Sequence, residues 1–108
     1  MNHLFTIICE YKGGTYTRQL HSTNPQAVLE AWAKQFQQEG ILNETEQELF
    51  AEEMRYSLEE SNLIPLQGLQ NIWYEGFSLA DDLLEIMVVG TQEQPIEVGQ
   101  RAATLRAA

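Results

Sequence analysis

Residues 71–91 constrain the fold of this chain more than any other stretch, because they hold a long, largely apolar run at 83–89. Two runs rich in aromatic and β-branched residues flank Ala80-Asp81-Asp82, a polar break of turn-forming residues, and this pattern predicts a β-hairpin. In the second run, alternate side chains are apolar on both faces. A strand of that kind is usually central in its sheet or covered twice. We therefore expect this hairpin to supply the middle of the sheet.

A second hairpin is predicted at the start of the chain. Residues 4–11 have the composition of a strand, with Phe5 and Cys9 on its more apolar face. The glycines at 13–14 tolerate the positive φ values of a tight turn. Residues 15–21 alternate as a strand does, but both faces include polar side chains. We expect this strand to be more exposed, at an edge of the sheet.

The first predicted helix begins near residue 25. Asn24 or Thr23 can cap its free amides, and Pro25 suits the first helical position because its missing N–H is not needed there. Gly40 is placed to end the helix in a left-handed conformation. The apolar residues at helical spacing are Val28, Leu29, Trp32 and Phe36.

The second predicted helix starts after Asn43, which can cap it, with Glu46 three residues further on. Only residues 41–42 separate Gly40 from this cap, and so short a connection favours two helices packed as a pair. The apolar stripe of this helix is Leu49, Phe50, Met54 and Leu58, with Tyr56 beside it.

Two segments are not assigned to regular structure. Residues 61–70 form an unusually apolar loop, and we expect it to lie across an open edge of the core. Residues 92–108 differ in composition from the rest of the chain. Pro95 and Gly99 interrupt any regular element, and only Leu105 offers an apolar anchor in the last stretch. We predict a single domain over 1–91 and a C-terminal tail over 92–108 that is frayed or ordered by a partner chain.

Together these elements predict an α+β fold of the order ββααββ. Both hairpins would join into one antiparallel four-stranded sheet, with the helix pair on one face as a two-layer sandwich. One face of the sheet would then remain uncovered. We therefore expect a homodimer that buries this open sheet face against a copy of itself.

The charge balance narrows the choice of partners. Sixteen acidic residues stand against six basic ones, which gives a formal net charge of −10. Such a surface disfavours nucleic acid and anionic membranes, because both carry negative charge. A charged partner would be a basic protein. The simpler interpretation, that the negative charge keeps the protein soluble, is the more common one.

The sequence also indicates a compartment. The chain has one cysteine, Cys9, so no internal disulfide framework is possible and a reducing environment fits. Residues 1–4 lack the basic and then apolar pattern of a signal peptide. No apolar run approaches the ~20 residues that span a bilayer. We expect a soluble cytoplasmic protein.

Few residues suggest chemistry, and we assign no catalytic residue, cofactor or metal. Cys9 alternates with apolar neighbours, which favours a buried structural thiol over a nucleophile. His3 and His21 have no Cys or His at metal-ligand spacing. The acidic residues of the second helix are expected on its solvated outer face rather than around a metal. They are Glu44, Glu46, Glu48, Glu52, Glu53, Glu59 and Glu60.

The aromatic and apolar residues of the second hairpin are the best candidates for a contact surface. We predict a possible interface at Trp73, Phe77, Met87 and Val89; core packing is the alternative for these residues.

Three functions stay open. The first, which we favour, is a non-enzymatic protein-interaction module. The second is an acidic inhibitor or immunity-type protein that binds a basic toxin or nuclease. The third is a small enzyme or ligand-binding protein that uses Cys9 or His21 in a cleft beside a carboxylate.

Overall fold

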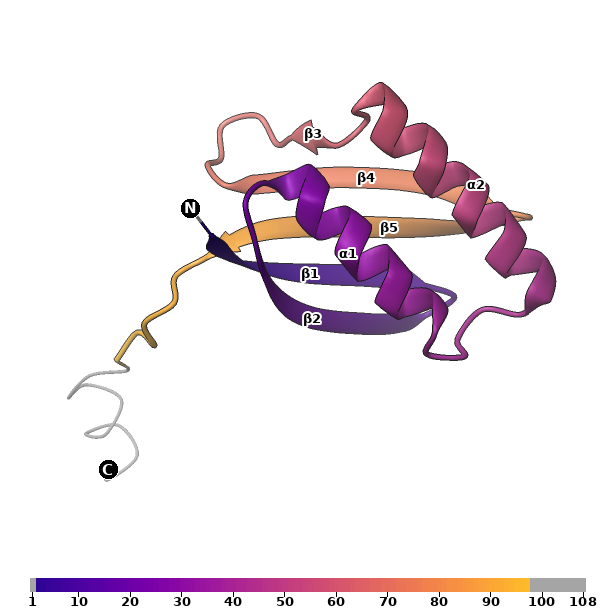
Figure 1. Cartoon of the computed structure of the whole chain (residues 1–108), viewed down its shortest axis with the longest axis horizontal. Helices are drawn as coiled ribbons and strands as arrows, with labels where there is room; N and C mark the ends of the chain where they lie inside the picture. Colours follow the sequence, from indigo (N-terminus) through magenta and orange to yellow (C-terminus); the bar gives the residue numbers. More distant parts are fainter. Residues whose placement is uncertain (1, 98–108) are drawn as a thin grey trace.

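The computed structural model describes residues 2–97 as five strands and two helices. The elements, in chain order, are β1 (His3–Tyr11), β2 (Gly14–Ser22), α1 (Pro25–Gln37), α2 (Glu44–Glu60), β3 (Ile64–Pro65), β4 (Ile72–Leu79) and β5 (Asp82–Thr91). Figure 1 shows the strands side by side, with both helices lying across them. The predicted α+β class is confirmed.

All strands pair antiparallel in one sheet, in the order β2-β1-β5-β4-β3. The pairing of β1 with β5 joins the first hairpin to the second, so the two ends of the described chain meet in the centre of the sheet. The middle position of β5 confirms the expectation drawn from its two apolar faces. The edge position of β2 is also confirmed.

The prediction of four strands was wrong by one short strand. Ile64 and Pro65 of β3, inside the predicted loop, pair with Tyr74 and Trp73 of β4. The Leu66 N–H also donates to the Ile72 carbonyl at 2.9 Å. Because proline has no N–H to donate, a strand that contains it is tolerated at an edge. The loop thus follows the outer edge of β4.

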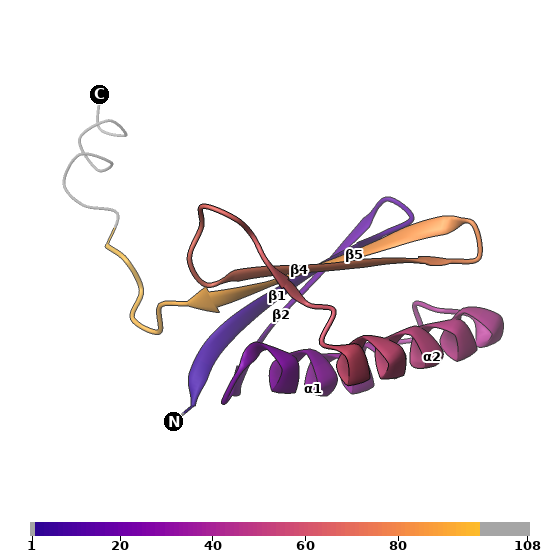
Figure 2. The ribbon, with the colours of Figure 1, turned by 90° about the horizontal axis from the view of Figure 1, so that it is seen from above.

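Both helices lie on the same side of the sheet (Figure 2). Helix α1 packs over β1 and β2, and α2 packs over β4. Apolar side chains fill the space between the layers, and Trp32 is their centre: its ring stacks on Phe36 with centroids 4.8 Å apart and meets Phe50 edge-on at 6.0 Å. The fully buried large side chains are Trp32, Phe36, Phe50, Ile7, Leu29, Leu79, Leu84, Ile86, Val28, Val88 and Cys9.

The helix starts follow the predicted capping residues. The Asn24 side chain accepts the Ala27 N–H at 2.8 Å, with Pro25 in the first turn. Asn43 and Glu46 form a reciprocal capping box, with hydrogen bonds of 2.8 and 2.9 Å. Each bond satisfies a backbone or side-chain group that a free helix end would leave to water.

The two hairpin turns fix the strand register. Tyr11 pairs with Gly14 across Lys12 and Gly13, which both have positive φ. Leu79 pairs with Asp82 across the two-residue turn Ala80-Asp81. Two-residue turns whose first residue has a positive φ, as Lys12 and Ala80 do, match the right-handed twist of a β-ribbon. The second turn therefore decides which residues of β4 and β5 share a face.

Beyond Thr91, residues 92–97 have no helix or strand. The rest of the predicted tail, 98–108, lies outside the described residues. No helix within 2–97 combines the length and the hydropathy needed to cross a membrane.

Candidate functional site

The side of the sheet away from the helices is not covered by any element within residues 2–97 (Figure 2). We call this surface over β1, β4 and β5 the open face. Its side chains alternate with those of the core, and most are half-buried by one another. They are Leu4, Thr6, Ile8 and Glu10 from β1, Ile72 and Tyr74 from β4, and Leu83, Glu85, Met87 and Val89 from β5.

An apolar row crosses the middle of the open face. Ile8 is opposite Met87, and Met87 is opposite Tyr74, so the row runs over the three central strands. The next row towards the end of β5 has Val89 between Thr6 and Ile72. Cross-strand neighbours of this kind pack on one another. They leave a continuous apolar surface in the centre of the sheet.

A polar row lies beside it. Glu10 is directly opposite Glu85, and Glu85 is opposite Gly76. The Tyr74 hydroxyl donates to Glu85 Oε2 at 2.9 Å. This hydrogen bond is the first cause of a raised pKa at Tyr74, and burial adds to it. Together with Ile8 and Met87, these side chains line a groove of about 220 Å³.

A second hollow, of about 630 Å³, opens at the end of the sheet where α1 begins. Phe5 and Trp73 meet edge to face in its wall, with ring centroids 6.3 Å apart. The residues around it are His3, Leu4, Phe5, Thr23, Asn24, Pro25, Asn71, Trp73, Gly90, Thr91 and Gln92. Among these described residues there is no Asp, Glu, Lys, Arg or Cys, and His3 is the one histidine.

The four predicted interface residues do not lie together. Trp73 and Phe77 face the helices and pack against the core, whereas Met87 and Val89 lie on the open face. Grouping them on one face was wrong, because the two-residue turn pairs odd-numbered residues of β4 with even-numbered residues of β5. Met87 and Val89 remain as candidates for contact.

Cys9 is fully buried among core side chains. Burial, with a smaller effect of the nearby Glu10 charge, raises the pKa of its thiol to about 12. A thiol that stays protonated and inaccessible is a poor nucleophile. The expectation of a buried structural cysteine is confirmed.

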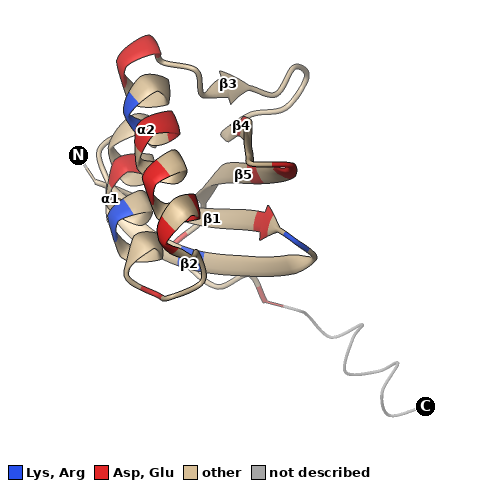
Figure 3. Ribbon diagram, turned by 90° about the vertical axis from the view of Figure 1, so that its right-hand side faces the viewer, with Lys and Arg blue, Asp and Glu red and all other residues tan. Residues whose placement is uncertain are grey.

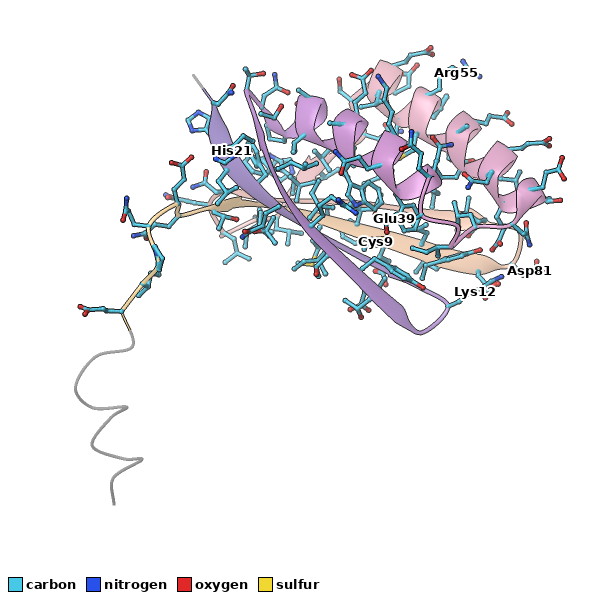
Figure 4. All side chains as sticks on the ribbon, turned by 60° about the horizontal axis from the view of Figure 1, so that its bottom comes forward. Cys9, Lys12, His21, Glu39, Arg55 and Asp81 are labelled. Atoms are coloured by element: carbon cyan, nitrogen blue, oxygen red, sulfur yellow. The ribbon has the colours of Figure 1, made fainter. Side chains whose placement is uncertain are left out.

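His21 lies at the exposed end of β2, where its Nε2 is 3.1 Å from Glu93 Oε1. Figure 4 shows it far from Cys9, at the opposite end of the molecule from Lys12 and Asp81. Both partners of the His21–Glu93 pair are more than half exposed. The structure therefore does not bring together the two residues proposed for chemistry.

Most acidic residues of α2 are exposed. Figure 3 marks their positions in red along the helix. Glu46 is an exception and was predicted wrongly: it is buried, and it accepts a hydrogen bond from the Tyr11 hydroxyl. Lys12 Nζ lies 2.9 Å from the same carboxylate. The sequence signal was present, since Glu46, Phe50 and Met54 follow at helical spacing.

These contacts shift the pKa values of Glu46 and Tyr11 in opposite directions. Hydrogen bonds from Tyr11, from the Asn43 amide and from Lys12 lower the pKa of Glu46 to about 2. Burial and the Glu46 hydrogen bond raise the pKa of Tyr11 to about 12. Tyr11 and Lys12 hold the start of α2 against the end of β1, and the Asn43 bond lies within the cap of α2. The contacts of this cluster are structural, because they connect α2 to the sheet.

Sequence reasoning missed a second buried acid, Glu75. It shares the helix-facing side of β4 with Trp73 and Phe77, and Ser57 of α2 donates a hydrogen bond of 2.6 Å to it. Burial raises the pKa of Glu75, the Ser57 bond opposes the shift, and the Glu53 charge adds to it. Its alternation with Trp73 and Phe77 was the signal that could have placed it.

No group of His, Cys, Asp or Glu side chains within residues 2–97 is arranged to hold a metal ion. Comparison of the chain with protein-family models, curated proteins and solved structures finds no match.

Proposed function

We propose that the chain is a non-enzymatic protein-interaction module that binds through the open face. The observation that carries this proposal is the apolar row Ile8–Met87–Tyr74 on the three central strands, on the side that carries no helix. Apolar surface removed from water favours association by about 25 cal/mol per Å². Adjacent apolar side chains that stay partly accessible, as these do, mark contact sites on folded proteins.

The enzyme alternative has less support. Cys9 is sealed in the core, and His21 pairs with Glu93 on an exposed edge. Neither residue lines the groove on the open face or the hollow beside α1. A catalytic base needs a substrate site within hydrogen-bond reach, and neither of these two hollows provides one for Cys9 or His21.

The size of the open face bears on the kind of partner. Three strands spaced about 4.8 Å apart, each about eight residues long at about 3.3 Å per residue, present roughly 400 Å². Burying this area on both partners gives on the order of 800 Å², below the ~1,200–2,000 Å² of a stable specific interface. A strand, loop or other small element of a partner fits this area better than an obligate subunit.

A homodimer through the open face remains a proposal of its own. A two-fold axis that runs along the strands through the apolar row would place the Glu10–Glu85 row of each copy against that of the other. Like charges across an interface disfavour association. A homodimer would therefore need an axis that runs across the strands, along the apolar row, so that the acidic row of each copy faces the Thr6–Val89–Ile72 row of the other.

The test uses the full chain and peptides selected from a displayed random library. We expect selected peptides to bind the wild type, to lose binding to Met87→Gln, and to keep it to Tyr56→Gln. Tyr56 is a matched control, because it is an exposed aromatic on α2 and 56% accessible. Amide signals of β1, β4 and β5 should shift on binding. A library without binders, or binders indifferent to Met87→Gln, would contradict the proposal.

Light scattering during size exclusion tests self-association in the same samples. A dimer that Met87→Gln dissociates and Tyr56→Gln leaves intact supports the homodimer. A monomer at micromolar concentration contradicts it.

The acidic-inhibitor function is a second candidate, favoured by the exposed acidic residues of α2, whose positions Figure 3 marks in red. Asp81 and Asp82 extend the negative charge to the β4–β5 turn. A basic toxin or nuclease held by this surface would dissociate steeply with salt. Binding that depends on Glu48 and Glu52 of α2, rather than on Met87, would support this candidate over the first.

A further inference from the structure

We propose that the groove on the open face receives an arginine side chain from a basic partner. The inference rests on the proposed function, and it names the chemistry of the partner. The occupant would be a strand or loop that places apolar side chains on the Ile8–Met87–Tyr74 row and one guanidinium between Glu10 and Glu85.

The register of the sheet creates the charge pair. Glu10 and Glu85 are direct cross-strand partners on β1 and β5, two central strands of the sheet. Directly opposed like charges destabilise a sheet, and their Cβ atoms are about 4.5–5.5 Å apart. A cation placed between them would turn this repulsion into attraction. The isolated chain thus holds an unfavourable pair that a basic partner relieves.

Tyr74 and Gly76 shape the site around Glu85. A Cβ atom at Gly76 would lie 2.5 Å from the Tyr74 hydroxyl oxygen, so the absence of a side chain lets the Tyr74 ring lie along the strand. From there the hydroxyl reaches Glu85 Oε2. This hydrogen bond orients one carboxylate oxygen and presents an aromatic face beside it. A guanidinium can pair with a carboxylate and stack on such a face.

Arginine fits the groove better than lysine for a geometric reason. The groove encloses about 220 Å³ between Ile8, Met87 and Tyr74, with the two carboxylates at one side. A guanidinium offers several N–H donors in a plane, which can serve two carboxylates at once. The ammonium of lysine is a compact, strongly hydrated charge and gains less from an aromatic neighbour.

The cations of the described chain do not neutralise the pair. Lys12 contacts Glu46 and Asp82, Arg18 contacts Glu39, and Arg55 contacts Glu59. Among residues 2–97, no ion pair joins a Lys, Arg or His to Glu10 or Glu85. All sixteen acidic residues lie in this part of the chain, with four of the six basic ones. The surrounding field therefore attracts a basic partner.

The experiment measures binding of synthetic peptides to the full chain by calorimetry. Three peptides of equal length alternate valine with arginine, lysine or glutamine and are otherwise identical. We expect the arginine peptide to bind most tightly. The variant Glu10→Gln/Glu85→Gln should weaken binding of the arginine peptide about tenfold or more.

The matched control is Glu48→Gln/Glu52→Gln, which removes the same charge from exposed positions on α2. It should weaken binding of the arginine peptide about twofold or less, because distant charges are screened by salt. Gly76→Ala provides a further variant that keeps both carboxylates. It should weaken binding of the arginine peptide by displacing Tyr74, and it should weaken binding of the glutamine peptide less.

Equal weakening by both double variants would overturn the inference, since it would show a general field without a specific groove. A glutamine peptide that binds the open face as tightly as the arginine peptide would overturn it too, but the proposed function would stand. Failure of every peptide to shift the amide signals of β1, β4 and β5 would count against both.

Discussion

Glu46, at the start of α2, is buried against Tyr11, at the end of β1, and accepts a hydrogen bond from its hydroxyl. The contact spans 35 positions in the sequence. It joins the helical layer to the sheet at the end of the molecule where both hairpin turns lie (Figure 1). The stability of the fold should therefore depend on the charge of this one carboxyl group.

We predict that Glu46→Gln lowers the free energy of unfolding by about 1 kcal/mol at pH 7. Glutamine can still complete the capping box, so the loss reports on the Tyr11 and Lys12 contacts. Solvent screens part of it, because the Lys12 side chain is 48% exposed. Urea unfolding measures the difference, with Glu48→Gln as an exposed control. Equal effects of both variants would contradict the prediction.

The pH dependence of this contribution has a definite sign. The folded protein lowers the pKa of Glu46 from 4.5 to about 2, so the folded state binds the proton less tightly than the unfolded state. The stabilisation is fully present above pH 4.5 and is lost as the pH falls towards 2. The wild type and Glu46→Gln should converge over that range.

Glu75 should behave in the opposite way. Burial raises its pKa in the folded state, so the charged form is disfavoured there. Above the raised pKa, the wild type therefore loses stability relative to Glu75→Gln, which still accepts the Ser57 hydrogen bond. We expect Glu75→Gln to be the more stable protein at pH 7 to 8. The difference should close as the pH falls to the ordinary value of 4.5. Urea unfolding at several pH values measures it, and a less stable variant at pH 8 would refute the prediction.

The two tryptophans should contribute differently to stability, because they are buried to different extents. Trp32 is 1% exposed, stacks on Phe36 and meets Phe50 edge-on, so Trp32→Ala should cost about 3–5 kcal/mol. This is a large share of the ~5–15 kcal/mol that stabilises a small domain. Trp73 is only half-buried, and Trp73→Ala should cost less. Thermal unfolding followed by circular dichroism compares them, and the reverse order would be incompatible with the described core.

Gly76→Ala should change the open face without disturbing the core. The φ of Gly76 is not positive, so alanine fits the backbone, but its Cβ would collide with the Tyr74 hydroxyl. Loss of the hydrogen bond to Glu85 should lower the pKa of Tyr74 towards its ordinary value of 10.0. Titration of ring-labelled tyrosine by NMR measures this pKa. An unchanged Tyr74 pKa in the variant would show that the ring is not held as described.

The Cys9 thiol should be unreactive in the folded protein. It is fully buried, and its pKa is raised to about 12. Labelling by a thiol-specific disulfide reagent should proceed only as fast as the protein opens, and it should accelerate with urea. The urea-denatured chain is the control for full reactivity. Stoichiometric labelling of the native protein within seconds would contradict the burial of Cys9.

Much of the fold follows from local patterns in the sequence. The alternation in 4–11 and 83–89, the short turns and the capping residues Asn24 and Asn43 are each decided by neighbours a few positions away. These signals were sufficient for both hairpins, both helices and the central place of the second hairpin. These local patterns do not predict strand β3, because a strand of two residues has no detectable alternation.

The sequence determined which segments become strands and helices, since backbone geometry and capping depend on adjacent residues. Only the tertiary structure decided which faces those segments bury. A single two-residue turn set the register that separates Trp73 and Phe77 from Met87 and Val89. The pairing of β1 with β5 placed Glu10 opposite Glu85, and helix packing sealed Glu46 and Glu75 inside. The β1–β5 pairing and the helix–sheet contacts join residues far apart in the chain, where no local pattern fixes the pairing.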